Sequence, residues 1–464
     1  MFESMTFPFF LGITVLLFFL LPAKYRAAVL LFSSYCFCGF MSFFALAVLI
    51  TVSVLVWAGG ILIERLQKAG KEMGGRVVAM SAVGACILVL IMFKYGRGSL
   101  FGMIMPIGLS FYLFQAIGYL SDIAKGKCHA ERNFIHLGCL FAFFPKLISG
   151  PIEREGDFLP QIKRLEEVKF WNRGRLSTAF TYMLWGYFMK MVVADRLAGQ
   201  VNILFERPQE FDSLWLVLGA FFYTIQIYCD FAGYSYIAIG CARIFDIRLT
   251  QNFNAPYQAA SITEFWRRWH ISLSSWLRDY IYVPLGGNRK GFGRKCINTI
   301  IVFAVCGIWH GAGMHFVVWG LLHGVYSLID SMIRRKGWKM PFGKFVTFLE
   351  VSFAWIFFRA DSLRQALGYI YHMVTAGIRT EQIQSVSETL GLTMSEIIII
   401  ILGIILVCFV DELCNRKHTN FSFLIQQRQN AFRYAVFYLL LVAIFIFGIY
   451  GSGYQTEQFI YMQF

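Results

Sequence analysis

Long apolar runs recur along most of the chain, and they limit what it can fold into. A helix of about 20 apolar residues is long enough to cross the hydrocarbon core of a bilayer. Of the 464 residues, 58% are hydrophobic, against ~45–50% in soluble proteins. The runs lie at residues 7–21, 27–40, 42–63, 77–93, 99–121, 133–149, 176–194, 213–229, 231–246, 298–328, 346–358, 395–411 and 432–450. We therefore expect an all-α, polytopic integral membrane protein with about eleven transmembrane helices, plus shorter re-entrant and interfacial helices.

The basic residues give these spans a direction. Lys and Arg concentrate in the loops 64–76, 247–297 and 412–431, whereas the ends 1–6 and 451–464 contain neither. Because short loops rich in Lys and Arg stay in the cytoplasm, we expect these three loops inside and both termini outside. The same distribution accounts for the net charge of +15 without a basic face, so a nucleic-acid-binding protein is excluded.

No feature of the sequence divides the chain. No internal repeat, low-complexity linker or shift in composition occurs, so residues 1–464 are expected to form one membrane domain. The first apolar run has no basic segment before it and no small-residue cleavage site after it, which predicts an uncleaved first span. The 11 cysteines form no C-x-x-C pair, so neither a disulfide framework nor a zinc site is expected.

Two segments depart from the simple pattern of spans and loops. Run 133–149 is basic on both flanks, which favours a re-entrant or half-inserted segment. The loop 247–297 is rich in Trp and Arg, and Ser261–Glu264 fits a capping box that starts a helix over about 262–281. Because Trp and Leu recur in it at helical spacing, we expect this helix to lie at the membrane interface with its aromatics at headgroup depth. A plain interfacial anchor without chemistry explains the pattern equally well.

Two histidines lie in or beside apolar sequence, where an ionisable group is costly. His310 stands between the apolar stretches 300–306 and 316–322, and His270 lies in the predicted interfacial helix. Imidazole is the side chain best suited to proton transfer near neutral pH. We therefore expect a functional site at His310, with a buried histidine that only satisfies hydrogen bonds as the alternative. No H-E-x-x-H motif occurs, so a metal site is not expected.

Longer motifs follow one another from about residue 106 to the end of the sequence. They are PIGLSFYLFQ (106–115), FPKLISGPI (144–152), YCDFAGYSY (228–236), QNFN (251–254), FWRRWHISLSSWLRD (265–279), PLGGN (284–288), GIWHG (307–311), WIFFRA (355–360) and FIYMQF (459–464). Together they resemble the membrane-bound O-acyltransferase (MBOAT) family. Within it, the chain is similar to the bacterial branch with the alginate O-acetyltransferase membrane subunit and the D-alanyl-transfer protein of teichoic acid modification. The motif-bearing core covers about 106–330.

The resemblance implies a fold, a donor and a site. The fold is a helical membrane bundle around a central tunnel, which an acyl thioester approaches from the cytoplasm. The near-invariant histidine of the family corresponds to His310, and a second polar position corresponds to His270. The donor is acetyl-coenzyme A or an acylated carrier protein, and no cofactor stays bound. Similar proteins lie in the bacterial inner membrane and pass the acyl group to the outer face, often to a secreted or membrane-anchored esterase-like partner that modifies an exopolysaccharide.

Acyl transfer to a hydroxyl requires a base, a polarised carbonyl and the exclusion of water, and His310 is our candidate for the base. His270 could orient the donor, stabilise the oxyanion, or only anchor its helix. Further candidates for the wall of the tunnel are Asp230, Gln226, Asn252, Asn254, Trp309, Arg267, Arg268 and Ser274. For any single amide among them, an ordinary interhelical hydrogen bond is the simpler explanation.

Other polar residues in apolar sequence carry expectations of their own. Asp230 falls between two apolar runs and is expected to pair with an Arg or to face a water-filled cavity. Lys146 and Lys190 could snorkel to the membrane interface. His323 is expected to be a hydrogen-bonded core residue, and His315 is off the helical face of His310.

Three functions stay open at the level of the sequence. The first is transfer of an acyl group, favoured as acetyl because the WIFFRA stretch and the chain length look more like the polysaccharide O-acetylation branch. The second is D-alanyl transfer from a carrier protein to teichoic acid. The third is a transporter or flippase for a glycan or lipid, which polar residues in spans would also suit, although no inverted repeat is found.

Overall fold

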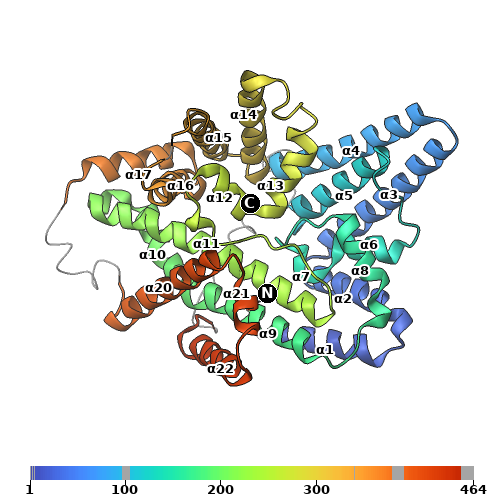
Figure 1. Ribbon diagram of the computed structural model, residues 1–464, viewed down its shortest axis with the longest axis horizontal. Helices are drawn as coiled ribbons and strands as arrows, with labels where there is room; N and C mark the ends of the chain where they lie inside the picture. Colours follow the sequence, from blue (N-terminus) through green and yellow to red (C-terminus); the bar gives the residue numbers. More distant parts are fainter. Residues whose placement is uncertain are drawn as a thin grey trace. The chain divides into compact units, whose positions relative to one another are not determined.

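The computed structural model describes residues 2, 4, 6–96, 105–338, 340–378 and 391–450, and every regular element within them is a helix (Figure 1). The described chain divides into two compact units. The first contains Met1–Met183 and Ile237–Gln251, and the second contains Leu184–Tyr236 and Asn252–Phe464. The prediction of a single domain over 1–464 stays a prediction. The closing FIYMQF motif at 459–464 lies outside the described residues.

Seven of the described helices are long and apolar enough to cross a membrane, which confirms an all-α integral membrane protein. They are α3 (Phe43–Lys68), α4 (Glu72–Tyr95), α11 (Ser213–Ile244), α14 (Gly291–His310), α15 (Met314–Arg335), α20 (Met394–Arg416) and α22 (Asn430–Phe447). The sequence predicted about eleven spans, which is more than the seven found among the described helices. The difference lies in apolar runs that fold into shorter helices, such as α1 (Thr6–Leu20).

The first unit is built around the paired helices α3 and α4, which pack together and against α5 (Leu109–Ala124). Ser42 starts α3 by accepting a hydrogen bond from the amide of Ala45 at 3.2 Å. The remaining helices of this unit are α1, α2 (Arg26–Met41), α6 (Phe134–Ala142), α7 (Phe144–Leu147), α8 (Glu155–Lys163), most of α9 (Arg173–Tyr187) and the end of α11 from Ile237 onward, with the 3₁₀ turns η1 (Ala23–Tyr25) and η2 (Leu165–Glu167).

The apolar run 133–149 forms two short helices, α6 and α7, rather than one span. At 1.5 Å per residue, the 9 residues of α6 extend only ~14 Å, about half of a bilayer core. This length agrees with a re-entrant segment. Lys146 in α7 is 1% exposed and donates to Gln115 Oε1 at 2.6 Å, so the expectation that it snorkels to the interface is wrong. Burial among protein groups that accept its hydrogen bonds replaces contact with water.

The second unit contains α11 from its start to Tyr236, together with the helices that carry His270 and His310. Its other elements are α10 (Asp195–Glu206), α12 (Ile262–Arg268), α13 (Ile271–Leu277), α16 (Gly343–Arg359), α17 (Leu363–Thr375) and α21 (Phe421–Gln426), the π-helices η3 (Phe188–Ala194) and η6 (Arg278–Tyr282), and the 3₁₀ turns η4 (Pro208–Glu210) and η5 (Pro256–Gln258). The runs 213–229 and 231–246 were expected to be separate, but they form the single helix α11. Asp230 therefore lies inside a helix, where the loss of water around its charge is offset by a lysine.

Helices α14 and α15 form a tight hairpin that ends the first of them at His310. The predicted run 298–328 is thus broken by a turn at 311–313. The two helices approach so closely that a Cβ atom at Gly307 would collide with the carbonyl oxygen of Phe316. A Cβ at Gly320 would likewise collide with the carbonyl of Phe303. Glycine at these two positions therefore allows the close approach of α14, which ends at His310, to α15.

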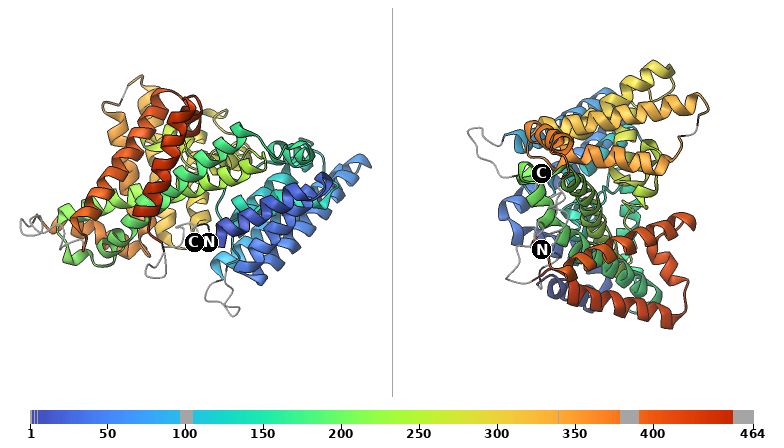
Figure 2. Two further views of the ribbon diagram at one scale, coloured as in Figure 1. Left: turned by 90° about the horizontal axis from the view of Figure 1, so that it is seen from below. Right: turned by 90° about the vertical axis from the view of Figure 1, so that its left-hand side faces the viewer.

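Helices α20 and α22 both pack against η3, and Figure 2 shows them at the red end of the chain. Thr393 and Glu396 form a full capping box at the start of α20, since each side chain accepts from the other's backbone amide. The polar segment before α20 is described only from residue 391 onward.

Candidate functional site

The motif FWRRWHISLSSWLRD forms a broken helix rather than a continuous one. Ser261 accepts a hydrogen bond from the amide of Glu264 at 3.2 Å, as the predicted capping box requires, while the Glu264 carboxylate accepts from Ala260 instead of Ser261. Helix α12 then ends at Arg268, and α13 begins at Ile271. The predicted helix over 262–281 is therefore wrong in its middle. The backbone between the two helices takes a left-handed conformation at His270, with φ 44° and ψ 53°.

Asn252 explains why the helix breaks at this point. Its main-chain carbonyl accepts from the amide of Ile271 at 3.0 Å, and its side-chain Oδ1 accepts from the amide of Ser272 at 3.1 Å. These are the first amides of α13, which have no partner within their own helix. A residue other than glycine in the left-handed conformation costs ~1–2 kcal/mol. The Asn252 contacts offset this cost and turn the His270 side chain into the protein, where it is fully buried.

The aromatic side chains around this turn are core residues. Trp266, Trp269 and Trp276 are 8%, 1% and 5% exposed, so they pack inside the protein instead of against lipid headgroups, and their depth in a membrane stays a prediction. Trp269 packs against Trp355 with ring centroids 5.1 Å apart, and Trp355 stacks on Trp319 at 5.6 Å. The helical spacing of the tryptophans was correctly interpreted as an apolar face, but that face contacts protein instead of lipid.

His310 closes α14 with its imidazole directed back along the helix. Its Nδ1 lies 2.7 Å from the carbonyl oxygen of Cys306, one turn earlier. A carbonyl oxygen can only accept a hydrogen bond, so Nδ1 carries the proton and the lone pair of the neutral ring is on Nε2. The ring packs edge-on against Trp319 and Phe358, with centroids 4.7 and 5.4 Å away. His310 is 3% exposed, so this nitrogen is held in a water-poor setting.

Trp309 brings the two histidines into one cluster. Its ring centroid lies 4.8 Å from that of His310 and 6.1 Å from that of His270. Phe231 of α11 contacts His270 from another side at 4.8 Å. The cluster therefore joins the α12–α13 break, the end of α14 and the middle of α11, three segments whose residues are 39 positions or more apart in sequence. This grouping makes the predicted pair of His310 and His270 a single structural site.

Burial alone keeps His270 neutral. The loss of water around the ring lowers the pKa of His270 to about 3. The side chain is therefore uncharged over the physiological range and can act through a hydrogen bond or through packing, but not as a cation.

A buried ion cluster lies on α11 next to Phe231. Asp230 Oδ1 is 2.7 Å from Lys190 Nζ, and the same Nζ is 2.8 Å from Asp195 Oδ1. Lys190 is 1% exposed, so the expectation that it snorkels is wrong, and the partner of Asp230 is a lysine instead of an arginine. Lys190 belongs to the π-helix η3, whose wider turn is a form that often occurs at functional sites.

The remaining candidates divide by location. Gln226 is 6% exposed, and its Oε1 has no hydrogen-bond partner among the described residues. Asn254 and Arg267 are exposed, and Arg268 pairs with Glu264 Oε1 at 2.6 Å and with Asn415. The Ser274 hydroxyl donates to the Trp269 carbonyl at 3.3 Å. No contact of these last four side chains reaches either imidazole in the described structure, and their roles in a tunnel stay predictions.

The other two histidines of the α14–α15 hairpin, His315 and His323, make contacts of a different kind. His323 is fully buried and accepts from Trp266 Nε1 at 3.3 Å, which confirms a hydrogen-bonded core residue. His315 packs against the neighbouring Phe316, with ring centroids 4.2 Å apart and the ring planes tilted by 46°. Sequence reasoning missed the supports of the site, namely Phe231, Cys306, Asp195 and the anchoring role of Asn252. The amide-rich QNFN motif shortly before the Trp–His motif could have indicated such an anchor, whereas Phe231, Cys306 and Asp195 carry no sequence signal for their roles.

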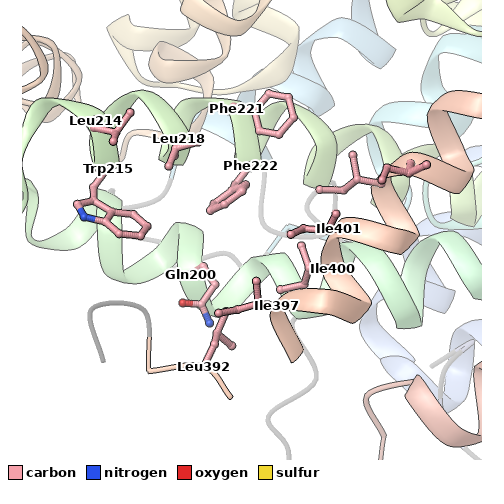
Figure 3. Close-up of a pocket in the computed structure, with 12 residues that line it drawn as sticks. Gln200, Leu214, Trp215, Leu218, Phe221, Phe222, Leu392, Ile397, Ile400 and Ile401 are labelled. Carbon is pink, nitrogen blue, oxygen red and sulfur yellow. The ribbon is translucent and has the colours of Figure 1, made fainter. Parts of the chain in front are cut away.

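A separate cavity of about 400 Å³ lies between α10, α11 and the start of α20 (Figure 3). Its lining is apolar, with Leu218 and Phe222 from α11 and Ile400 from α20, apart from Gln200. Neither imidazole lines it. This cavity is therefore distinct from the histidine cluster, and the central tunnel stays a prediction.

The sequence of this chain matches that of known acyltransferases over the region that holds the site. Residues 139–364 match the pattern of MBOAT, the membrane-bound O-acyltransferase family. The chain is 36% identical over 374 residues to the "Probable alginate O-acetylase AlgI" of Pseudomonas fluorescens, a match covering 77% of this chain and 71% of that protein. This chain belongs to the membrane-bound O-acyltransferase family. It is a multi-pass membrane protein and an O-acyltransferase, as the motifs indicated.

Two more distant MBOAT relatives mark the breadth of the family. The "Peptidoglycan O-acetyltransferase" of Helicobacter pylori is 34% identical over 302 residues, which cover 59% of this chain and 57% of that protein. The "Teichoic acid D-alanyltransferase" of Bacillus subtilis is 26% identical over 260 residues, which cover 53% of this chain and 64% of that protein. Both names describe transfer of an acyl group to a cell-envelope polymer.

Proposed function

We propose that this MBOAT protein transfers an acetyl group from a cytoplasmic thioester to a hydroxyl on the outer side of the bacterial inner membrane, for O-acetylation of an extracellular polysaccharide. The donor is acetyl-coenzyme A, and the acceptor route passes through a secreted or membrane-anchored esterase-like partner. Both termini lie outside in this proposal, because the basic loops 64–76, 247–297 and 412–431 stay in the cytoplasm.

The tautomer of His310 is the observation that carries the proposal. The carbonyl of Cys306 holds the proton on Nδ1, so Nε2 is the basic atom of the ring. A base that is fixed in orientation and shielded from bulk water is what hydroxyl activation requires. The same carbonyl stabilises the imidazolium that forms once Nε2 has taken a proton, because Nδ1–H then donates to it more strongly.

The transfer step balances with this one base. Nε2 of His310 takes the proton from the acceptor hydroxyl as its oxygen attacks the thioester carbonyl, and a carbon–oxygen bond forms. The carbon–sulfur bond breaks, and the proton on Nε2 goes to the departing thiolate. The products are an ester and a free thiol, with no net change in protons.

His270 and Trp309 support this step by position. The indole of Trp309 packs against both imidazoles, and Asn252 fixes the turn that carries His270. Neutral His270 can donate a hydrogen bond to a developing oxyanion without adding a second positive charge beside His310. This role is distinct from that of the base, so its removal should lower turnover without abolishing it.

The relatives favour acetyl over D-alanyl as the transferred group. Those named as alginate O-acetylases are about ten percentage points more similar to this chain than the D-alanyltransferase of Bacillus subtilis. The longer matches also cover more of the chain, at 77% against 53%. The name alginate O-acetylase describes those relatives, and it supports an extracellular polysaccharide as the acceptor here.

The test is a reconstituted transfer assay with a choice of donors. Full-length protein in vesicles receives labelled acetyl-coenzyme A or a labelled D-alanyl carrier protein on the side of the basic loops. We expect a labelled ester that alkali removes, on a polysaccharide or esterase-like acceptor on the opposite side, from the acetyl donor alone. Label from the D-alanyl donor alone would replace the acetyl assignment, and transport of an unmodified glycan without a donor would contradict the proposal altogether.

A further inference from the structure

An apolar groove lies between α20, α21 and α22, apart from the histidine cluster. Its volume is about 470 Å³, and fourteen of its sixteen lining residues are apolar or aromatic. Trp185 and Phe188 form one wall, where Trp185 stacks on Phe188 and on Phe421 with centroids 5.5 and 4.5 Å away. Figure 2 shows α20 and α22 as the red helices, which both pack against η3.

The groove is open along its length. Phe409 of α20, Phe432 of α22 and Leu439 of α22 all line it and are 58%, 50% and 64% exposed. In a membrane, such a surface is covered by hydrocarbon chains rather than by water. A concave surface of this kind holds a chain more tightly than a flat helix face does, because more of the chain surface is in contact.

The two remaining lining residues are cations, Lys417 and Arg428. Both are exposed, and within the described chain neither side chain has a hydrogen bond or an ion pair. The neighbouring Arg416 differs, since its Nε lies 2.6 Å from Glu412 Oε1. The groove therefore carries two positive charges, one directly after α20 and the other in the segment that precedes α22.

We propose that this groove binds one anionic phospholipid, with its acyl chains along the apolar wall and its phosphate between Lys417 and Arg428. Charge complementarity selects the headgroup, because a zwitterionic lipid presents no net negative charge to the two cations. Both residues lie in the loop 412–431 that the charge pattern assigns to the cytoplasm, the side on which basic residues next to a membrane attract anionic lipids. This lipid site is separate from the histidine cluster, and the proposal does not depend on acyl transfer.

Native mass spectrometry of the purified full chain measures this binding directly. The probes are dioleoyl phosphatidylglycerol, dioleoyl phosphatidylcholine with the same chains, and inorganic phosphate. We expect one phosphatidylglycerol retained in preference to phosphatidylcholine, and a loss of about thirtyfold in its affinity in the Lys417→Gln/Arg428→Gln variant. The control Arg65→Gln/Lys71→Gln removes two exposed cations from another basic loop and should bind as the unchanged protein does.

A second variant tests the chains instead of the headgroup. Ala443 lines the groove, and Ala443→Phe should block it without changing charge and lower retention of phosphatidylglycerol as well. This variant also decides the result if the charge variant fails to fold. Equal retention of the two lipids, displacement of the lipid by millimolar phosphate, or full retention by a folded Ala443→Phe protein would overturn the proposal.

Discussion

Replacing Lys190 by Met should destabilise the second unit strongly, because it leaves two buried carboxylates facing each other. Lys190 Nζ lies 2.8 Å from Asp195 Oδ1 and 2.7 Å from Asp230 Oδ1, so these two oxygens are at most about 5.5 Å apart. At an effective dielectric constant of ~20, two negative charges at that distance repel by about 3 kcal/mol. Loss of one partner from a buried ion pair typically costs ~3–5 kcal/mol, which agrees with this figure.

The assay is unfolding of the purified protein in mixed detergent micelles, followed by the loss of helical circular dichroism. Lys190→Met should lower the free energy of unfolding by at least ~3 kcal/mol. The double variant Lys190→Met/Asp230→Asn should recover part of that loss, because the repulsion disappears with one charge. As a control, Lys68→Met removes a lysine that is 64% exposed and pairs with Glu64, and should change stability by no more than ~0.5 kcal/mol. If Lys190→Met unfolds together with this control, the cluster does not stabilise the fold and the reasoning fails.

Three further predictions concern the geometry around the histidines. Gly307→Ala should push α14 away from α15 and lower the rate of acyl transfer at least ~10-fold, since a displacement of ~1 Å can lower a rate even further. Gly293→Ala is the control in the same helix, because a Cβ atom there meets open space. It should retain full activity and raise the free energy of unfolding by up to ~1 kcal/mol. Asn252→Ala should lower the free energy of unfolding by ~1–3 kcal/mol and lower turnover, because a buried amide of α13 loses its acceptor. The exposed Asn254→Ala should leave the free energy of unfolding unchanged. Burial lowers the pKa of His270 to about 3, so as pH falls the unfolded chain protonates this ring before the folded chain does. The free energy of unfolding should therefore decline between about pH 6.5 and 3. The decline should be steeper than in His270→Gln by up to ~1.4 kcal/mol per pH unit. Parallel pH dependences of unfolding for the two proteins would contradict the buried, neutral ring.

The membrane class and the leading histidine could be predicted because each leaves a local signal. Runs of about 20 apolar residues indicate spans without knowledge of packing. His310 stands out because an ionisable group is rare in such sequence. The capping serine of α12 was also predictable, since Ser261 and Glu264 lie at the spacing that a helix start requires.

What could not be predicted depends on contacts between distant residues. The break at His270 arises from Asn252, 18 residues earlier, which captures the first amides of α13. Likewise, Lys146 and Lys190 were expected to reach water, but each finds its acceptors inside the protein. Hydropathy alone cannot distinguish a lysine that snorkels from one that is paired at the same depth. The tryptophans of α12 and α13 were misplaced for the same reason, because an apolar helix face is identical in sequence whether it meets lipid or protein.

The central claim is that Nε2 of His310 is the base for acyl transfer. His310→Asn tests it most directly, because the Asn side-chain amide can still donate to the Cys306 carbonyl while no basic nitrogen remains. The measurement is the initial rate of labelled acetyl transfer in vesicles at equal amounts of folded protein, with the exposed His129→Asn as the control. The account predicts a rate lowered by about 10²–10⁴-fold in His310→Asn and unchanged in the control. A His310→Asn rate within about threefold of the unchanged protein would be far too small a loss for a catalytic base and would contradict the claim.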